Sequence, residues 1–341
     1  MKKRSFVVLC VLTLALTACG SSSEKPSSGS TESGASGPHT AITVEFTYTW
    51  KGEYAPLVYA DEKGLFAKQG LDVTFKEGKG SQVTYSSLGD GPNTFVIGPS
   101  GTAAQAASTG VPVTNVATFI PVTPSVLVAK NGTQLKTPKD LEGKTVGLRS
   151  GADASLFFSS FLKTNNVDAS KVKVSGLDGS AANAAFLSGQ VQVVDVFSNN
   201  ELPTLTAKLD GKAPNTLAFS DFGFTILGQG VTVSNAFLKS SPDIIKKFLI
   251  AETAGIEAAK KNPVDAAKVL KSRHSAALPD ESIVEQQVKA TLDAMVPESG
   301  HPLGYVSAPA WDKMLDLFQQ TGQIKNRLST ATYYTNDLLP K

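Results

Sequence analysis

Residues 42–75 read ITVEFTYTWKGEYAPLVYADEKGLFAKQGLDVTF, and the order of the patterns within them decides the fold. Over residues 42–48 apolar and polar side chains alternate, which is typical of a strand with one buried face. A predicted helix follows and ends at Gly64, and a second alternating strand covers residues 71–75. A strand, a helix and a strand in this order predict parallel pairing and an α/β layer, because the helical crossover returns the chain in its original direction.

The same alternation continues along the chain and predicts a second unit of this kind after Thr137-Pro138. With 341 residues, the chain is longer than one typical domain of about 100–200 residues. Helical patterns run from the last predicted strand to the end of the chain. Beyond the first two, strands are predicted at residues 111–117, 125–129, 144–148, 172–174, 191–197 and 228–233.

The N-terminus has the pattern of an export signal followed by a lipid attachment site. Three basic residues, at positions 2–4, precede an apolar run over residues 6–18 that is too short for the ~20 residues of a membrane-spanning helix. The end of this run and the two residues after it read Leu16-Thr-Ala-Cys19-Gly20, which resembles the bacterial lipobox. The only other cysteine, Cys10, lies inside the signal itself. We therefore predict a signal peptide over residues 1–18 and an acylated Cys19 that anchors the protein to membrane lipid.

Residues 19–40 are predicted to be a flexible, lipid-anchored linker, because residues 21–39 lack any large apolar side chain. The expected location is the extracytoplasmic face of the cell membrane. Without the three basic residues of the signal, the chain has 29 basic and 30 acidic residues. A nearly neutral protein offers no electrostatic case for binding nucleic acid.

Three segments resemble, in the right order, the NMT1-like group of periplasmic binding proteins, which serve importers of thiamine-pyrimidine precursors, riboflavin, nitrate and sulfonates. Residues 60–73 are similar to the group's A-x-x-x-G-x-F-x-x-x-G-L-x-V segment. Residues 107–113 resemble its A-x-x-G-x-P-V, and residues 139–147 its D-L-x-G-K-x-V-G. The resemblance spans about Ile42 to Pro263. The order of the three segments carries it, since each segment alone is ordinary.

The resemblance implies an α/β fold of the two-lobed periplasmic-binding-protein clamshell type (type II) with two hinge crossovers. We expect lobe 1 at residues 41–125 plus 231–341 and lobe 2 at residues 126–230, with crossovers near residues 123–128 and 227–233. The implied protein is the monomeric solute-binding subunit of an ABC importer, which delivers a small organic nutrient to membrane permease subunits. The resemblance implies no cofactor and no metal.

The chain departs from the group at a Gly-x-x-Asp turn that many members carry before a strand in each domain. The corresponding stretches here begin at Gly89 and Gly189 and have no aspartate in place. Asp195 lies nearby, and whether it takes over this role is left open by the sequence.

Side chains in the loops after predicted strands are the candidate ligand contacts, because open α/β sheets bind ligands beyond the carboxyl ends of their strands. Trp50 and Tyr54 could stack on a flat ring, or Trp50 could cover the edge of its domain. Ser100 could hold ligand oxygens at a helix start, or cap that helix. The full predicted set is Trp50, Tyr54, Ser100, Arg149, Ser150, Asp153, Asn199 and Glu201.

Arg149 decides the expected charge of the ligand. An unpaired guanidinium in the cleft would predict an organic anion such as an alkanesulfonate, since it pairs bidentately with carboxylate or sulfonate. Neutralisation by Asp153 or Glu201, or exposure to solvent, favours an uncharged heterocycle of the thiamine-precursor or riboflavin type. Asn199 and Glu201 could recognise amide or amino groups of such a ring, or belong to an ordinary polar loop.

An enzyme is not predicted. The serine at position 150 stands one place late for a G-x-S-x-G nucleophile elbow, and His39, His274 and His301 form no evident catalytic triad or metal-ligand spacing. No phosphate-binding P-loop is present in the sequence. The alternatives of another class are a sensory binding subunit and a hydrolase of unknown type.

Overall fold

The structure is a computed structural model that describes residues 38–88, 93–150 and 152–341. The predicted signal peptide, Cys19, most of the linker and Gly89 lie outside the described residues, as do the side chains of Asp153 and Ser180. All of the structure discussed below belongs to one unit of the chain, Gly37–Lys341.

The first sheet has five strands in the order β2-β1-β3-β10-β4. Strand β1 pairs in parallel with both β2 and β3, whereas β10 runs antiparallel between β3 and β4. In β1, Ile42, Val44 and Phe46 are buried on one face, as their alternation predicts. The strands are β1 Thr40–Phe46, β2 Leu71–Lys76, β3 Thr94–Pro99, β4 Val113–Thr118 and β10 Gln229–Ser234.

Helices from both ends of the described chain cover this sheet and complete lobe 1. The 20-residue α9 packs along α1, and Gly255 of α9 makes this close approach possible: a Cβ there would lie 2.5 Å from the Cβ of Ala60. The helices are α1 Ala55–Glu62, α2 Leu65–Lys68, α3 Ser81–Ser87, α4 Ser100–Ser108, α8 Asn235–Ser240, α9 Pro242–Lys261, α10 Pro263–Arg273 and α11 Glu281–Ala294.

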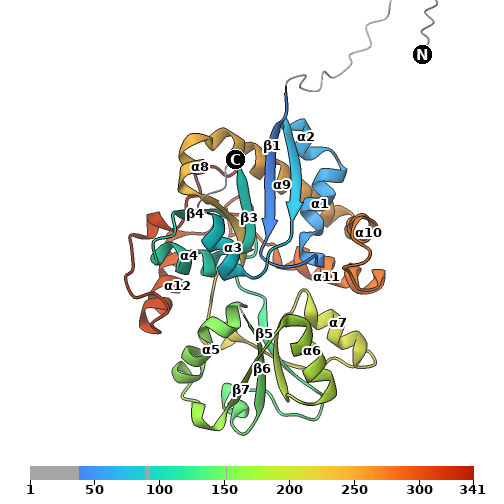
Figure 1. Ribbon diagram of the computed structural model, residues 1–341, viewed down its shortest axis with the longest axis vertical. Coiled ribbons are helices and arrows are strands. Elements are labelled where there is room, and N and C mark those ends of the chain that lie inside the picture. The colour runs from blue at the N-terminus through green and yellow to red at the C-terminus, as the bar shows by residue number, and fades with distance from the viewer. Residues whose placement is uncertain (1–37, 89–92, 151) are drawn as a thin grey trace, which may run out of the picture. The chain divides into compact units, whose positions relative to one another are not determined.

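The second sheet, in lobe 2, also has five strands, in the order β7-β6-β8-β5-β9. Every residue of β8 is buried, because apolar clusters lie on both faces of the sheet. Figure 1 shows the two sheets in separate lobes. The elements of lobe 2 are β5 Ser125–Ala129, β6 Thr145–Arg149, β7 Lys173–Leu177, β8 Val193–Phe197, β9 Asn215–Ala218, α5 Asp153–Thr164, α6 Gly179–Ser188 and α7 Glu201–Lys208.

The chain crosses between the lobes twice, once between β4 and β5 and once between β9 and β10. The predicted two-lobed α/β fold with two crossovers is confirmed. The crossing segments are residues 119–124 and 219–228, a few residues before the predicted positions. The division into residues 41–125 plus 231–341 and residues 126–230 remains our proposal for the lobes.

The prediction of parallel pairing holds for β1, β2 and β3 and for β6, β7 and β8. Strands β5 and β10, the first strands after each crossing, are antiparallel to their neighbours. Each of them arrives from the other lobe without the helical crossover that a parallel return requires.

The C-terminal helix α12, Ala308–Gln320, contributes to the contact between the lobes. Its Trp311 belongs to an apolar cluster that includes Val96 of lobe 1 and Phe157 of lobe 2. Just beyond α12, Gln323 hydrogen-bonds both Gln105 of lobe 1 and Ser160 of lobe 2. Among the described residues, no helix is both long enough and apolar enough to span a bilayer.

Candidate ligand-binding cleft

The strand ends of the two lobes meet around a small cavity of about 20 Å³. Residues from lobe 1, from both crossing segments and from the end of β8 line it, so the cavity lies where the lobes and the hinge meet. A volume of this size holds about one water molecule. The lining residues are Thr47, Glu53, Gly98, Pro99, Thr123, Pro124, Phe197, Gly228 and Gln229.

Arg149, at the end of β6, is almost completely buried and has two carboxylate partners. Its backbone N–H and its Nε donate to Asp195 at 2.6 and 3.2 Å, and its Nη1 lies 3.2 Å from an oxygen of Glu201. The guanidinium carbon lies 4.8 Å from the ring centre of Phe197, within cation–π range. Arg149 is thus neutralised by its own lobe, although its Nη2 is buried without a hydrogen-bond partner.

The charges around Glu201 keep this carboxylate ionised. Burial alone would raise its pKa, but Arg149, Lys51 and the backbone N–H of Phe197 outweigh burial and lower the pKa to about 2. The ammonium of Lys51 lies 2.6 Å from Glu201 and comes from lobe 1, so this ion pair joins the two lobes.

Glu53 is the carboxyl group that lines the cavity from lobe 1. It is buried, and burial raises its pKa above the usual 4.5, an effect that nearby Lys51 only partly offsets. Three carboxyl groups therefore stand close to two cations in this region. Burial raises the pKa of Asp195 as well, against the lowering effect of Arg149, so Glu53 and Asp195 are the groups of this set that hold a proton most readily.

A family model described as NMT1/THI5 like matches residues 51–266. The chain belongs to the NMT1/THI5-like family. Riboflavin-binding protein RibY of Chloroflexus aurantiacus is 25% identical over 351 residues, an alignment that covers 100% of this chain and 99% of RibY. The resemblance inferred from the ordered motifs is therefore confirmed.

Solved structures share the fold of this NMT1/THI5-like protein. The alkanesulfonate-binding protein SsuA of Xanthomonas axonopodis pv. citri, bound to MOPS, superposes with a TM-score of 0.67 at 16% identity, covering 86% of this chain and 98% of SsuA. The desulfurization enzyme DszB superposes with a TM-score of 0.61 at 10% identity, covering 87% of this chain and 97% of DszB. At these identities the likeness concerns the fold alone.

Trp50 and Tyr54, the two aromatic residues predicted to contact the ligand, pack against other side chains of lobe 1. Tyr54 is buried, and its ring stacks on Phe46 with centroids 3.8 Å apart. Trp50 stacks on His274 at 3.4 Å and meets Phe46 edge-on. In this arrangement both rings pack against protein, and their role as a stacking platform for a ligand stays a prediction.

None of the predicted residues whose side chains the structure describes is among those that line the cavity. The hydroxyl of Ser100 is 2.9 Å from that of Thr118 and accepts from Asn115, while Ser150 is exposed. Asp153 begins α5, and its side chain lies outside the described part of the structure. Arg149, Asn199 and Glu201 are the predicted residues that the fold brings to the lobe boundary.

Sequence reasoning missed several residues of this region. Lys51 and Glu53 are neighbours in sequence of the predicted Trp50 and Tyr54. Their position after the first strand could therefore have identified them as candidate residues of the cleft. Asp195, whose role the sequence left open, is fully buried in β8 and holds Arg149. Gln287 and Thr291 of α11 carried no signal, because no local pattern relates this helix to lobe 2.

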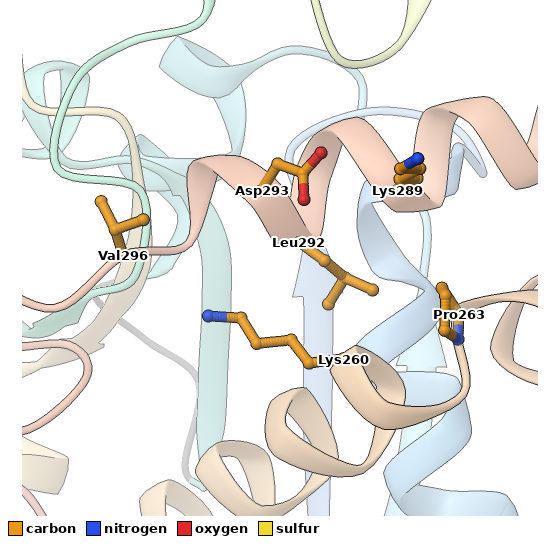
Figure 2. A pocket seen from close by; sticks show the side chains of 6 residues that line it. All are labelled: Lys260, Pro263, Lys289, Leu292, Asp293 and Val296. Atoms are coloured by element: carbon orange, nitrogen blue, oxygen red, sulfur yellow. The ribbon is translucent and has the colours of Figure 1, made fainter.

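A wider hollow of about 450 Å³ lies on lobe 1, between the end of α9 and α11 (Figure 2). Lys260, Lys289 and Asp293 are its charged lining residues, and no residue of lobe 2 contributes. Because it is open and far from the strand ends, we do not assign the ligand to it.

Proposed function

We propose that this protein is the extracytoplasmic, lipid-anchored solute-binding subunit of an ABC importer and that it captures an uncharged, ring-containing nutrient of the vitamin class. The pairing of Arg149 with Asp195 and Glu201 is the observation that carries this choice of ligand. A guanidinium with two carboxylate partners has no net positive charge to offer an anion. The similarity to RibY supports the same class.

The cavity offers hydrogen-bonding groups to such a ligand. The hydroxyl of Thr123 is buried there without a partner, and Glu53 supplies a carboxyl group whose pKa is raised by burial. Known ligand sites have volumes of about 300–1,000 Å³. A ring-containing ligand therefore enters only when the lobes move apart, and the lobes then close on it.

We propose binding rather than catalysis. RibY and SsuA are named as binding proteins, whereas DszB shows that the fold also occurs in an enzyme. In the described part of the chain, His39 pairs with Asp72, His274 stacks on Trp50 and His301 stacks on Tyr305. None of these three histidines is among the residues that line the cavity.

Purified protein is expected to be stabilised by riboflavin or by a thiamine-type pyrimidine, and not by MOPS. A ligand at 100 times its dissociation constant adds about 2.7 kcal/mol to the free energy of unfolding, which a thermal-shift assay detects. Stabilisation by MOPS without any by the neutral rings would replace the ligand class with an organic anion. Absence of stabilisation by all of them would reject the vitamin class.

A matched pair of variants tests whether the ligand binds in the cavity. Thr123→Val removes the unpartnered hydroxyl there and is expected to weaken binding up to about tenfold, the size of one hydrogen bond. Thr232→Val removes another buried hydroxyl without a partner, in β10 and outside the cavity lining, and should leave affinity unchanged. Equal effects of the two substitutions would argue against this site.

The lipid anchor is tested separately. Replacing Cys19 by serine is expected to leave an uncleaved precursor or to release the protein from membranes, because the acylated sulfur is lost. The control is Cys10→Ser, which removes the other cysteine of the chain and should not alter detergent partitioning. If Cys19→Ser partitions like the unaltered protein, the lipoprotein assignment fails.

A further inference from the structure

The two lobes are joined on one side by polar side chains of the protein itself. Helix α7 of lobe 2 begins at Glu201, and the residues at its start meet the first loop of lobe 1. The ammonium of Lys51 lies 2.6 Å from Glu201. The backbone N–H of Glu53 donates to Asn200 at 3.3 Å. Both contacts join positions about 150 residues apart along the chain.

Helix α11 of lobe 1 makes a second row of contacts with the same segment. The side-chain amide of Gln287 donates to the backbone oxygen of Asn200 at 2.8 Å and to Thr204 at 3.3 Å. Thr291 bonds to the side-chain amide of Asn199 at 3.0 Å. The side-chain oxygen of Gln287 also accepts a hydrogen bond from the backbone N–H of Gly52. Gln287 therefore contacts both the first loop of lobe 1 and the start of α7.

These groups are shielded from solvent. Asn199, Asn200, Gln287 and Thr291 are at most 4% exposed, and the side chains of Lys51 and Glu201 are 15% and 12% exposed. A buried ion pair and buried hydrogen bonds are stronger and less screened by salt than exposed ones. These groups contact one another and lie outside the cavity lining, so their contacts do not require a ligand in the cavity.

We propose that residues 199–201 of lobe 2 and Lys51, Gln287 and Thr291 of lobe 1 form a latch that holds the lobes closed before any ligand binds. The latch sets the fraction of closed molecules, and it influences ligand affinity without contacting the ligand. This influence on affinity rests on the proposed function, whereas closure itself does not. At α12 the lobes meet through an apolar cluster and the hydrogen bonds of Gln323, and the ion pairs of α12 with Arg327 join no residue of lobe 2 among the described residues.

The latch can be tested on the full-length protein without ligand. Spin labels, introduced as non-natural amino acids at Val83 and Val174, report the distance between the lobes, because these positions are exposed on lobe 1 and lobe 2. The unaltered protein is expected to show a predominant short distance. Lys51→Met and Gln287→Met together are expected to lower the ratio of closed to open molecules by about tenfold or more.

Two control variants separate latching from general effects. Lys63→Met removes an ion pair with Asp265 that lies within lobe 1 and should leave the distances unchanged. Lys51→Arg keeps the charge and should keep the lobes closed. A predominantly open unaltered protein, or a Lys51→Met, Gln287→Met protein that stays as closed as the unaltered one, would overturn the proposal.

Titration with riboflavin extends the test to affinity. The latched form, with a cavity of about 20 Å³, cannot admit a ring, so the apparent dissociation constant for riboflavin is the intrinsic value divided by the fraction of open molecules. The latch variants should therefore bind riboflavin more tightly in proportion to their gain of open molecules, while Lys63→Met binds as before. If riboflavin does not bind, the proposed ligand class fails, and the ligand-free distances still decide whether the latch exists.

Discussion

Replacing Arg149 with methionine is expected to lower the free energy of unfolding by about 3–5 kcal/mol, the usual loss when one partner of a buried ion pair is removed. Methionine retains much of the side-chain volume but no charge. Asp195 is fully buried, and Glu201 loses one of its two cationic partners. Asp195 is then left without the cation that compensates for its burial, and Glu201 keeps only Lys51.

The loss should depend on pH in a defined direction. Burial already raises the pKa of Asp195, and without Arg149 this pKa rises further, so the folded variant holds a proton that its unfolded chain releases. Its stability therefore falls as pH rises above the ordinary carboxyl pKa, and the deficit should be larger at pH 8 than at pH 5. Urea denaturation of both proteins at the two pH values measures this difference.

Lys171→Met is the matched control. Lys171 also has two carboxylate neighbours, Glu142 and Asp168, but it is exposed, and such pairs contribute about 0–1 kcal/mol. Adding Asp195→Leu to Arg149→Met should recover much of the stability, because the fully buried carboxylate is then gone while Glu201 still pairs with Lys51. A stable Arg149→Met protein at pH 8 would contradict the buried network.

The Glu252→Gln variant is expected to be more stable than the unaltered protein at alkaline pH and equally stable near pH 4. Glu252 of α9 is 3% exposed, and its Oε2 has no hydrogen-bond partner. Burial raises its pKa well above the usual 4.5. Below pH 4.5 the carboxyl group is neutral in both the folded and the unfolded chain, and it then has no effect on the pH dependence.

Above pH 4.5 the unfolded chain releases the proton and the folded chain keeps it, so each pH unit up to the raised pKa removes about 1.4 kcal/mol of stability. Glutamine has nearly the same volume and cannot ionise, which abolishes this slope. Chemical denaturation at pH 4, 6 and 8 measures it. Glu257→Gln, on an exposed position of the same helix, is the control and should not change the slope. Parallel pH profiles of unaltered and Glu252→Gln proteins would exclude a buried, protonated Glu252.

Local patterns determined most of the fold. The alternation in residues 42–48 and 71–75 predicted β1 and β2, because a strand with one buried face must alternate. In the motif that follows α1, Gly64 and Gly70 both have positive φ, 66° and 71°. A Cβ would meet no neighbour at either glycine, so the backbone conformation alone explains these two residues. Strands β3 and β9 were missed, since neither shows a clear alternation and β9 has only four residues.

The sequence by itself thus determined the α/β class, the order of the elements, the division into two units and the motifs that match the family. Tertiary structure alone decided that Arg149 is paired, that Trp50 stacks on His274, and that Asn199 and Glu201 meet lobe 1. The periodicity of an element shows which of its faces is buried, but it carries no information about which distant side chain lies opposite. Asp195 is 46 residues from Arg149 and Thr291 is 92 residues from Asn199, and only the packing of the folded lobes brings such residues together.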